Sequence, residues 1–215
     1  MHAVFVRLNR RLAAPLDLGP RLMLAVAGLL LVAVFLLPLW NLTMFAPQYP
    51  EGLRLDIYSY KLEGGNNDQD IKEINILNHY IGMRDLVAED FTEFKWLPFV
   101  VGALALLYLR AAAVGTVGHV VDVLVLNMYF SIFALWSFAY RLYSYGHSLS
   151  PTAAVKVAPF MPPVFGSKQL ANFTVFSYPG PASWAMGASM ALLIIAMFVA
   201  WRSSRAASRS SGARE

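Results

Sequence analysis

The stretch LMLAVAGLLLVAVFLLPLW, residues 22–40, decides the class of this protein because it carries no charged residue. A helix needs about 20 mostly apolar residues to cross the roughly 30 Å of hydrocarbon in a bilayer, so we expect a first membrane span here. The next residues, NLTMFAPQYP (41–50), contain no good small-x-small cleavage site. We therefore interpret the span as a retained anchor rather than a cleaved signal peptide.

The composition of the whole chain supports this interpretation. Of its 215 residues, 58% are hydrophobic and only 14% are charged, and the mean hydropathy is +0.52. These values are typical of an integral membrane protein. The chain has no cysteine, which excludes disulfides, thiolate zinc sites, iron–sulfur clusters and covalently attached haem.

Three further stretches are long and apolar enough to cross a bilayer. They define a mainly α fold, a four-helix integral membrane protein with a small mixed α/β extracytoplasmic cap. The expected order is a cytoplasmic N-terminus (1–21), TM1 (22–40), a first outer segment (41–95), TM2 (96–113), TM3 (117–140), a second outer segment (141–182), TM4 (183–201) and a basic cytoplasmic tail (202–215).

Lysine and arginine set the expected orientation, because cytoplasmic segments carry an excess of them. Both chain ends and the short connection after TM2 are basic, and four spans place all three on one side. The arginines concerned are Arg7, Arg10, Arg11, Arg21, Arg110, Arg202, Arg205, Arg209 and Arg214.

Tryptophans lie near the expected ends of the spans, as in an aromatic belt. They are Trp40, Trp96, Trp136, Trp184 and Trp201. We expect both termini in the cytoplasm and a polar, small-residue tail without fixed structure.

The two outer segments together are long enough for one small folded cap. Residues 53–62, LRLDIYSYKL, alternate as a half-buried strand does, and EGGNNDQD (63–70) is a turn cluster. A helix over 71–82 follows, with Asp70 and Glu73 spaced as a capping box. In the second outer segment we expect a loop with one strand near 172–177.

The stretch INILNHYIGMRD, residues 74–85, places His79 and Met83 four residues apart. If the helix continues past Gly82, both side chains share one face. Imidazole and thioether ligands together suit copper, especially Cu(I). His147 and Met161 in the second outer segment, with Met44 after TM1, are the other soft or nitrogen ligands outside the spans. The alternative is that His79 and Met83 form a packing face.

A second group of polar residues lies within the expected spans. His119, Asp122 and Asn127 are on TM3, and Arg110 ends TM2. Ionisable residues in a span are costly and often functional. Two alternatives remain open: a structural cluster, with Asp122 paired to Arg110 or hydrogen-bonded to His119, and a proton or ion relay.

The sequence contains no nucleophile elbow, phosphate-binding loop, dinucleotide fingerprint or zinc-protease motif. We therefore expect no enzyme, and nothing in the sequence suggests nucleic-acid binding. The first outer segment is acidic, with ten Asp or Glu against five Lys or Arg. It is suited either to docking a basic partner or simply to being solvated.

Three quoted segments resemble a family of small four-span bacterial membrane proteins. They are APQYPEGL (46–53), INILNHYIGM (74–83) and YSYGHSLSPTAAVKV (143–157) with PPVFGSKQLANFTVFSYP (162–179). The family is associated with gene neighbourhoods for nitrous oxide reductase and its copper maturation factors. The positions that carry the resemblance are Asn78, His79, Tyr80, Met83, Tyr145, Gly146, His147, Lys168, Gln169, Asn172 and Phe173.

The resemblance implies an accessory protein of the bacterial inner membrane that handles copper for, or helps assemble, a periplasmic copper enzyme. A transient Cu(I) site of His79, Met83, His147 and Met161 is the corresponding hypothesis. Its partners would be the lipid bilayer and a periplasmic copper protein or another membrane subunit. Two alternatives remain: a structural or docking subunit without metal, and a small proton- or ion-coupled transport module using His119 and Asp122.

Overall fold

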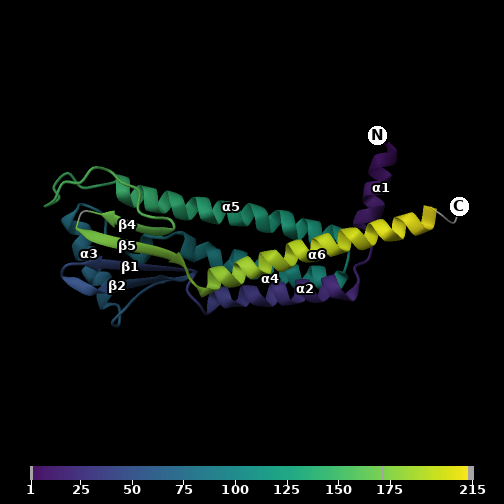
Figure 1. Cartoon of the computed structure of the whole chain (residues 1–215), viewed down its shortest axis with the longest axis horizontal. Helices are drawn as coiled ribbons and strands as arrows, with labels where there is room; N and C mark the ends of the chain where they lie inside the picture. The colour runs from purple at the N-terminus through teal and green to yellow at the C-terminus, as the bar shows by residue number, and fades with distance from the viewer. Residues whose placement is uncertain (1, 171, 213–215) are drawn as a thin grey trace. The chain divides into compact units, whose positions relative to one another are not determined.

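The structure is a computed structural model that describes residues 2–170 and 172–212. The chain is mainly helical with one small sheet, as the sequence predicts. It divides into two units (Figure 1). The helical unit comprises Met1–Ala33, Phe99–Ser131 and Ala185–Glu215, and the sheet unit comprises Val34–Pro98 and Ile132–Trp184.

Among the described residues, four helical segments are long and apolar enough to cross a membrane, as many as the sequence predicts. They are Leu18–Phe35, Glu93–Val114, Val117–His147 and Pro181–Ser204. The first consists of α2 (Leu18–Leu30) and the 3-10 turn η1 (Leu31–Phe35), the next two are α4 (Glu93–Val114) and α5 (Val117–His147), and the last belongs to α6 (Pro181–Gly212). A short further helix, α1 (His2–Leu12), precedes them.

The ends of these helices differ from the sequence prediction. The first span begins four residues earlier than expected and ends at Phe35, because Trp40 already belongs to a strand. α5 continues seven residues beyond the expected end at Tyr140. The tail that we expected to lack structure is helical up to Gly212, since alanine and arginine extend a helix readily. Residues 213–215 of that tail lie outside the described residues.

Small residues and polar side chains join the helices of the helical unit. A Cβ atom on Gly28 of α2 would lie 3.0 Å from Cβ of Tyr108 on α4, so these helices approach closely. Ser189 Oγ of α6 donates to the backbone oxygen of Ala27 at 2.8 Å. Asn127 Nδ2 of α5 lies 3.0 Å from Sδ of Met190 on α6. Each of these contacts links two different helices.

The sheet unit contains five antiparallel strands in the order β3-β2-β1-β5-β4. Their bounds are β1 Trp40–Ala46, β2 Tyr49–Ile57, β3 Leu62–Gly64, β4 Gly166–Leu170 and β5 Phe173–Pro179. β2 and β5 confirm the two strands expected near 53–62 and 172–177, although β2 starts earlier and ends at Ile57. β1 was missed because its residues directly follow an apolar span, and β4 because its polar sequence GSKQL shows no clear alternation.

One face of the sheet forms a hydrophobic core with α3 (Gln69–Tyr80). Alternate residues of the strands, with Leu77 and Ile74 of the helix, are buried there. The core consists of Met44, Ala46, Leu53, Leu55, Ile74, Leu77, Ile81, Leu170, Phe173 and Val175. The expected helix over 71–82 is therefore present but ends two residues earlier.

The expected capping box at the start of this helix is wrong. The N-cap residue is Asp68, whose φ of 64° is left-handed and whose side chain makes no cap hydrogen bond. Asp70 lies inside the helix and is buried, where it accepts hydrogen bonds from the Arg54 backbone N–H and the Asn66 amide, both at 2.8 Å. Glu73 accepts hydrogen bonds from Tyr49 Oη and Gln69 Nε2 instead, and these lower the pKa of its carboxyl. Asn66, Asn67 and Asp68 all have left-handed φ angles. The helix begins directly after them, at Gln69, two residues earlier than expected.

Candidate functional site

Two of the segments that carry the resemblance, those around residues 79–86 and 143–161, are joined in the sheet unit by backbone hydrogen bonds. The backbone N–H of Ser150 donates to Gly82 at 2.8 Å, and that of Val155 donates to Tyr80 at 3.0 Å. The N–H of Phe160 donates to Gly146 at 3.0 Å. The second outer segment is thus tied both to the end of α3 and to the end of α5. We refer to the joined segments 79–86, 143–161 and 166–170 as the motif cluster.

Two glycines make these close approaches possible. Gly82 has a φ of +82°, which ends α3, and a Cβ atom there would lie 2.9 Å from the Ser150 backbone oxygen. A Cβ atom on Gly146 would collide with the backbone oxygen of Phe160. Both positions therefore need the smallest residue for steric reasons. The glycines of NHYIGM and YSYGHS are explained by the packing of the cluster.

Two asparagines of the same stretch hold the chain after α3. Asn75 Oδ1 accepts the backbone N–H of Leu86 at 2.7 Å, and its amide reaches the Leu86 oxygen at 3.4 Å. Asn78 is buried, its backbone oxygen accepts the N–H of Met83 at 2.8 Å, and its amide lies 3.5 Å from the Arg84 oxygen. These side chains satisfy backbone groups that a helix end leaves without partners. Their role in the fold is structural.

A small pocket of about 180 Å³ opens within the motif cluster. Most of its lining is apolar, and Lys168 supplies a cation. The ammonium group of Lys168 donates to the Met161 backbone oxygen at 2.9 Å. The volume is below the range of roughly 300–1,000 Å³ usual for small-molecule sites, so the pocket suits at most an ion or a single side chain. Its lining consists of Ile81, Val157, Ala158, Phe160, Lys168, Gln169 and Leu170.

The four residues of the copper hypothesis lie on these joined segments, but their side chains have separate surroundings. His79 is exposed, whereas Met83 is half-buried and packs against the hydrophobic core. The His147 ring stacks on Tyr143 with ring centres 3.7 Å apart, and its Nδ1 lies 2.9 Å from the Tyr143 oxygen. Met161 is half-buried in the loop. Because the helix ends before Met83, the expected i, i+4 face of His79 and Met83 does not form.

The donor types still suit Cu(I), since imidazole nitrogen and thioether sulfur are soft enough to bind it. His79 and His147 are the members that fit best because both are exposed. Met83 fits least because of its contact with the core, and Met44 is part of that core. Within residues 2–170 and 172–212, no three side chains drawn from histidine, aspartate and glutamate gather as a metal site would.

The polar residues of the spans are not joined as the sequence suggested. His119 Nδ1 lies 2.6 Å from Thr116 Oγ1, and Asn127 is buried against Met190. Asp122 and Arg110 are exposed. Among the described residues, no ion pair joins Asp122 to Arg110 and no hydrogen bond joins it to His119. The turn at Gly115 to Val117 positions His119 to contact Thr116 instead.

Sequence reasoning missed two polar contacts, one made by Arg21, which was assigned only to topology, and one made by Arg141, which was given no role. Arg21 donates from Nε to the Ala112 oxygen at 2.8 Å and from its Nη2 to Ala113, so it caps the last turn of α4. Arg141 of α5 forms an ion pair with Glu93 of α4 at 2.7 Å, and Ser137 donates to the same carboxylate at 2.8 Å. Opposite charges near the start of α4 and the end of α5, Glu93 and Arg141, were the signal for the second contact.

Comparison of the chain with protein-family models, with curated proteins and with solved structures finds no match.

Proposed function

We propose that this protein is an accessory protein of the bacterial inner membrane that handles Cu(I) for, or helps assemble, a periplasmic copper enzyme of the nitrous oxide reductase type. The supporting observation is the motif cluster. Residues that lie far apart in the sequence, and that carry the family resemblance, are tied together there by backbone hydrogen bonds. His79, His147 and Met161 lie on those joined segments.

In this proposal Cu(I) is cargo that the motif cluster holds briefly and passes to a soluble partner. Exposed imidazoles suit such a role, because a partner can reach an ion that is bound at the surface. Thioether ligands also remain usable where thiols would oxidise, and the chain has no cysteine. An ion held by few ligands exchanges with a partner more readily, which agrees with the small number of soft donors in the cluster.

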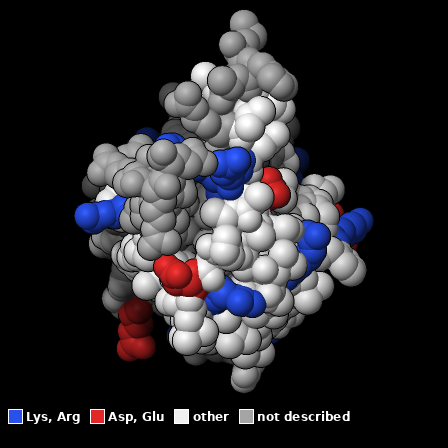
Figure 2. Space-filling model, turned by 90° about the vertical axis from the view of Figure 1, so that its right-hand side faces the viewer, with Lys and Arg blue, Asp and Glu red and all other residues white. Residues whose placement is uncertain are grey.

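The proposed topology places the sheet unit in the periplasm and both termini in the cytoplasm. Its support is the positive-inside rule. Basic side chains gather at the end of the helical unit that Figure 2 faces, with a few acidic ones among them. Arg10, Arg110 and Arg202 are exposed on that unit.

A Cu(I) titration of the purified protein in detergent, with a competing chelator, tests the proposal. We expect one tight equivalent in the wild type and its loss in the His79→Ala/His147→Ala variant. His119→Ala is the matched control, because it removes an imidazole from a span and should leave binding intact. Absence of a tight equivalent in the wild type, or equal binding by the double variant, contradicts the copper role.

A second candidate function is docking of a protein partner without metal. The face of the sheet opposite the core carries aromatic rings in two edge-to-face pairs, Phe45 with Phe176 and Phe165 with Tyr178. Phe165 is 67% exposed and Tyr178 is 44% exposed. Aromatic residues are enriched at protein interfaces. Co-purification of a partner that survives His79→Ala/His147→Ala but is lost in Phe165→Ser/Tyr178→Ser would favour this candidate.

A further inference from the structure

The N-terminal helix α1 has two unlike faces. With about 100° between successive residues of a helix, Val4, Phe5 and Leu8 fall on one side. Arg10 falls on the opposite side, and Val6 lies nearer to it than to Leu8. Val4 is 71% exposed, Phe5 is 61% exposed and Leu8 is 43% exposed. In the described part of the chain, no other element covers these three side chains, whereas Leu12, farther along the same side, lies against Gly118.

The position of α1 is fixed by the residues that follow it. The backbone N–H of Leu16 donates to Gly115 at 2.8 Å, and the N–H of Val117 donates to Ala14 at 3.1 Å. Residues 115–117 form the turn between α4 and α5, which are two of the candidate spans. α1 is therefore tied directly to the end of the spans, where a bilayer surface must lie if these helices cross it.

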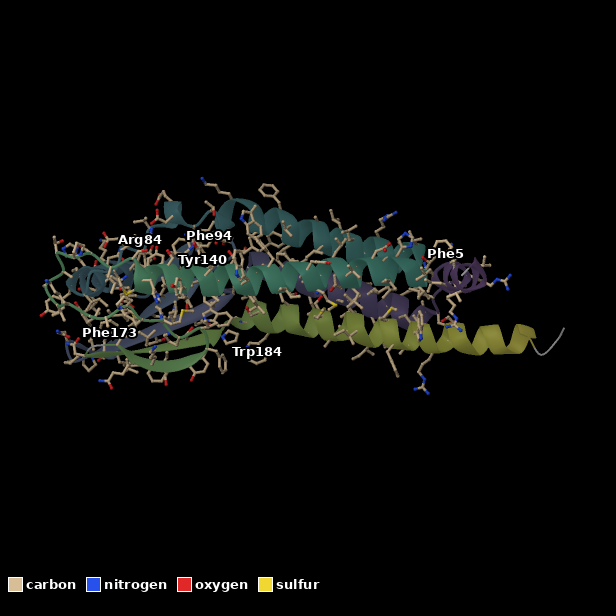
Figure 3. The ribbon with its side chains drawn as sticks, turned by 90° about the horizontal axis from the view of Figure 1, so that it is seen from above. Phe5, Arg84, Phe94, Tyr140, Phe173 and Trp184 are labelled. Carbon is tan, nitrogen blue, oxygen red and sulfur yellow. The ribbon has the colours of Figure 1, made fainter. Side chains whose placement is uncertain are left out.

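Two further contacts strengthen this attachment. Leu12 lies against Gly118, where an added Cβ atom would be 3.2 Å from the Leu12 oxygen. The Arg11 guanidinium lies over the ring of Trp201, 5.8 Å from its centre. Figure 1 shows α1 running crosswise to α2 within the helical unit, and Figure 3 labels Phe5 on it. A crosswise helix at the end of a span lies along a membrane surface rather than through it.

We infer that α1 lies in the headgroup layer of the bilayer that its own spans cross, and that it binds an anionic phospholipid surface. Val4, Phe5 and Leu8 enter the acyl boundary, and Arg10, on the opposite side, lies at the phosphate level. Interfacial helices with an apolar face and a basic polar face bind in this way, and arginines add attraction to anionic headgroups. The inference rests on the membrane placement in the proposed function, but not on copper.

The absence of cysteine from the chain permits single-site spin labelling. The full-length variants are Leu8→Cys on the apolar face, Val6→Cys as an apolar control on the other side, and Leu106→Cys on α4, where the leucine is 68% exposed. Each is reconstituted into nanodiscs of phosphatidylcholine with phosphatidylglycerol. Collision rates with oxygen, which concentrates in lipid, and with a water-soluble nickel chelate are then measured.

We expect the ratio of oxygen to nickel accessibility to be several-fold higher at position 8 than at position 6, and highest at position 106. Replacing phosphatidylglycerol by phosphatidylcholine should lower the ratio at position 8, because Arg10 loses its anionic partner. Equal ratios at positions 6 and 8, with position 106 in lipid, overturn the inference while leaving the membrane placement intact. Protection of position 8 from both reagents also overturns it, since a protein would then cover the helix.

If position 106 itself is accessible to nickel, the membrane placement fails and the proposed function fails with it. An unchanged ratio at position 8 in pure phosphatidylcholine overturns the anionic preference. The copper titration is independent of all these outcomes.

Discussion

The helical unit and the sheet unit bury their apolar residues in different ways. In the apolar 18-residue stretch that defines each candidate span, only 22–33% of the residues are buried, and large side chains such as Leu106 and Phe198 are exposed. The sheet unit instead encloses a continuous core of ten buried residues. The difference shows that the sheet unit is stabilised by its own packing, whereas the helical unit presents most of its apolar surface to its surroundings.

The largest expected difference between the two units is in the unfolding free energy lost when one phenylalanine of each is replaced by alanine. Phe173 is 2% exposed in the core of the sheet unit, and Phe198 on α6 is 60% exposed (Figure 3 labels Phe173). We expect Phe173→Ala to cost about 3–5 kcal/mol of unfolding free energy, through lost burial and a cavity. Phe198→Ala should change it by less than about 0.5 kcal/mol. Thermal unfolding and limited proteolysis of the sheet unit in detergent measure both, and equal effects would contradict the contrast.

Gly146→Ala should have the next largest effect. The added methyl group would collide with the Phe160 backbone oxygen, and backbone cannot move aside as a flexible side chain can. Overpacking of this kind costs about 1–3 kcal/mol. Gly187→Ala on α6 is the matched control, because nothing lies within 4 Å of its added Cβ atom. Faster proteolysis of residues 148–163 is expected in Gly146→Ala alone.

Within the helical unit, we expect a smaller difference in stability between replacing Arg21, which caps α4, and replacing Arg110. Arg21→Met removes two hydrogen bonds to the last turn of α4, and we expect a loss of about 1–2 kcal/mol. Arg110→Met is the control, because in the described chain Arg110 makes no hydrogen bond or ion pair. A fall in melting temperature of similar size in the two variants would show that Arg21 contributes only charge.

The smallest expected effect is the pH dependence of Tyr49 and Glu73. The hydrogen bonds from Tyr49 and then Gln69 lower the pKa of Glu73 below its ordinary value of 4.5. The folded state therefore gains stability above that value and loses it as the pH falls through the lowered pKa. Tyr49→Phe should flatten the dependence of melting temperature on pH below about 4.5. A wild-type profile already flat in that window would contradict the lowered pKa.

The candidate site was only partly predictable from the sequence. The spacing of His79 and Met83 suggested a shared helical face, but Gly82 adopts a left-handed conformation and α3 has already ended. The sequence assigned no structural role to Asn75 or Asn78, whereas both hold the chain after the helix. Their partners are Leu86 and Arg84, in the chain that follows the helix, and side-chain periodicity within the helix does not report such contacts.

The sequence by itself determined four stretches long and apolar enough to span a membrane, a helix within two residues of Gln69–Tyr80, and the strands around residues 53–57 and 173–177. Uninterrupted apolar length and side-chain periodicity are local properties, and they suffice for such elements. Only the tertiary structure decided that β1 follows the first span directly, that Gly146 meets Phe160, and that Arg21 caps α4. These features depend on steric contact and hydrogen bonds between distant residues, which are specified by the whole fold.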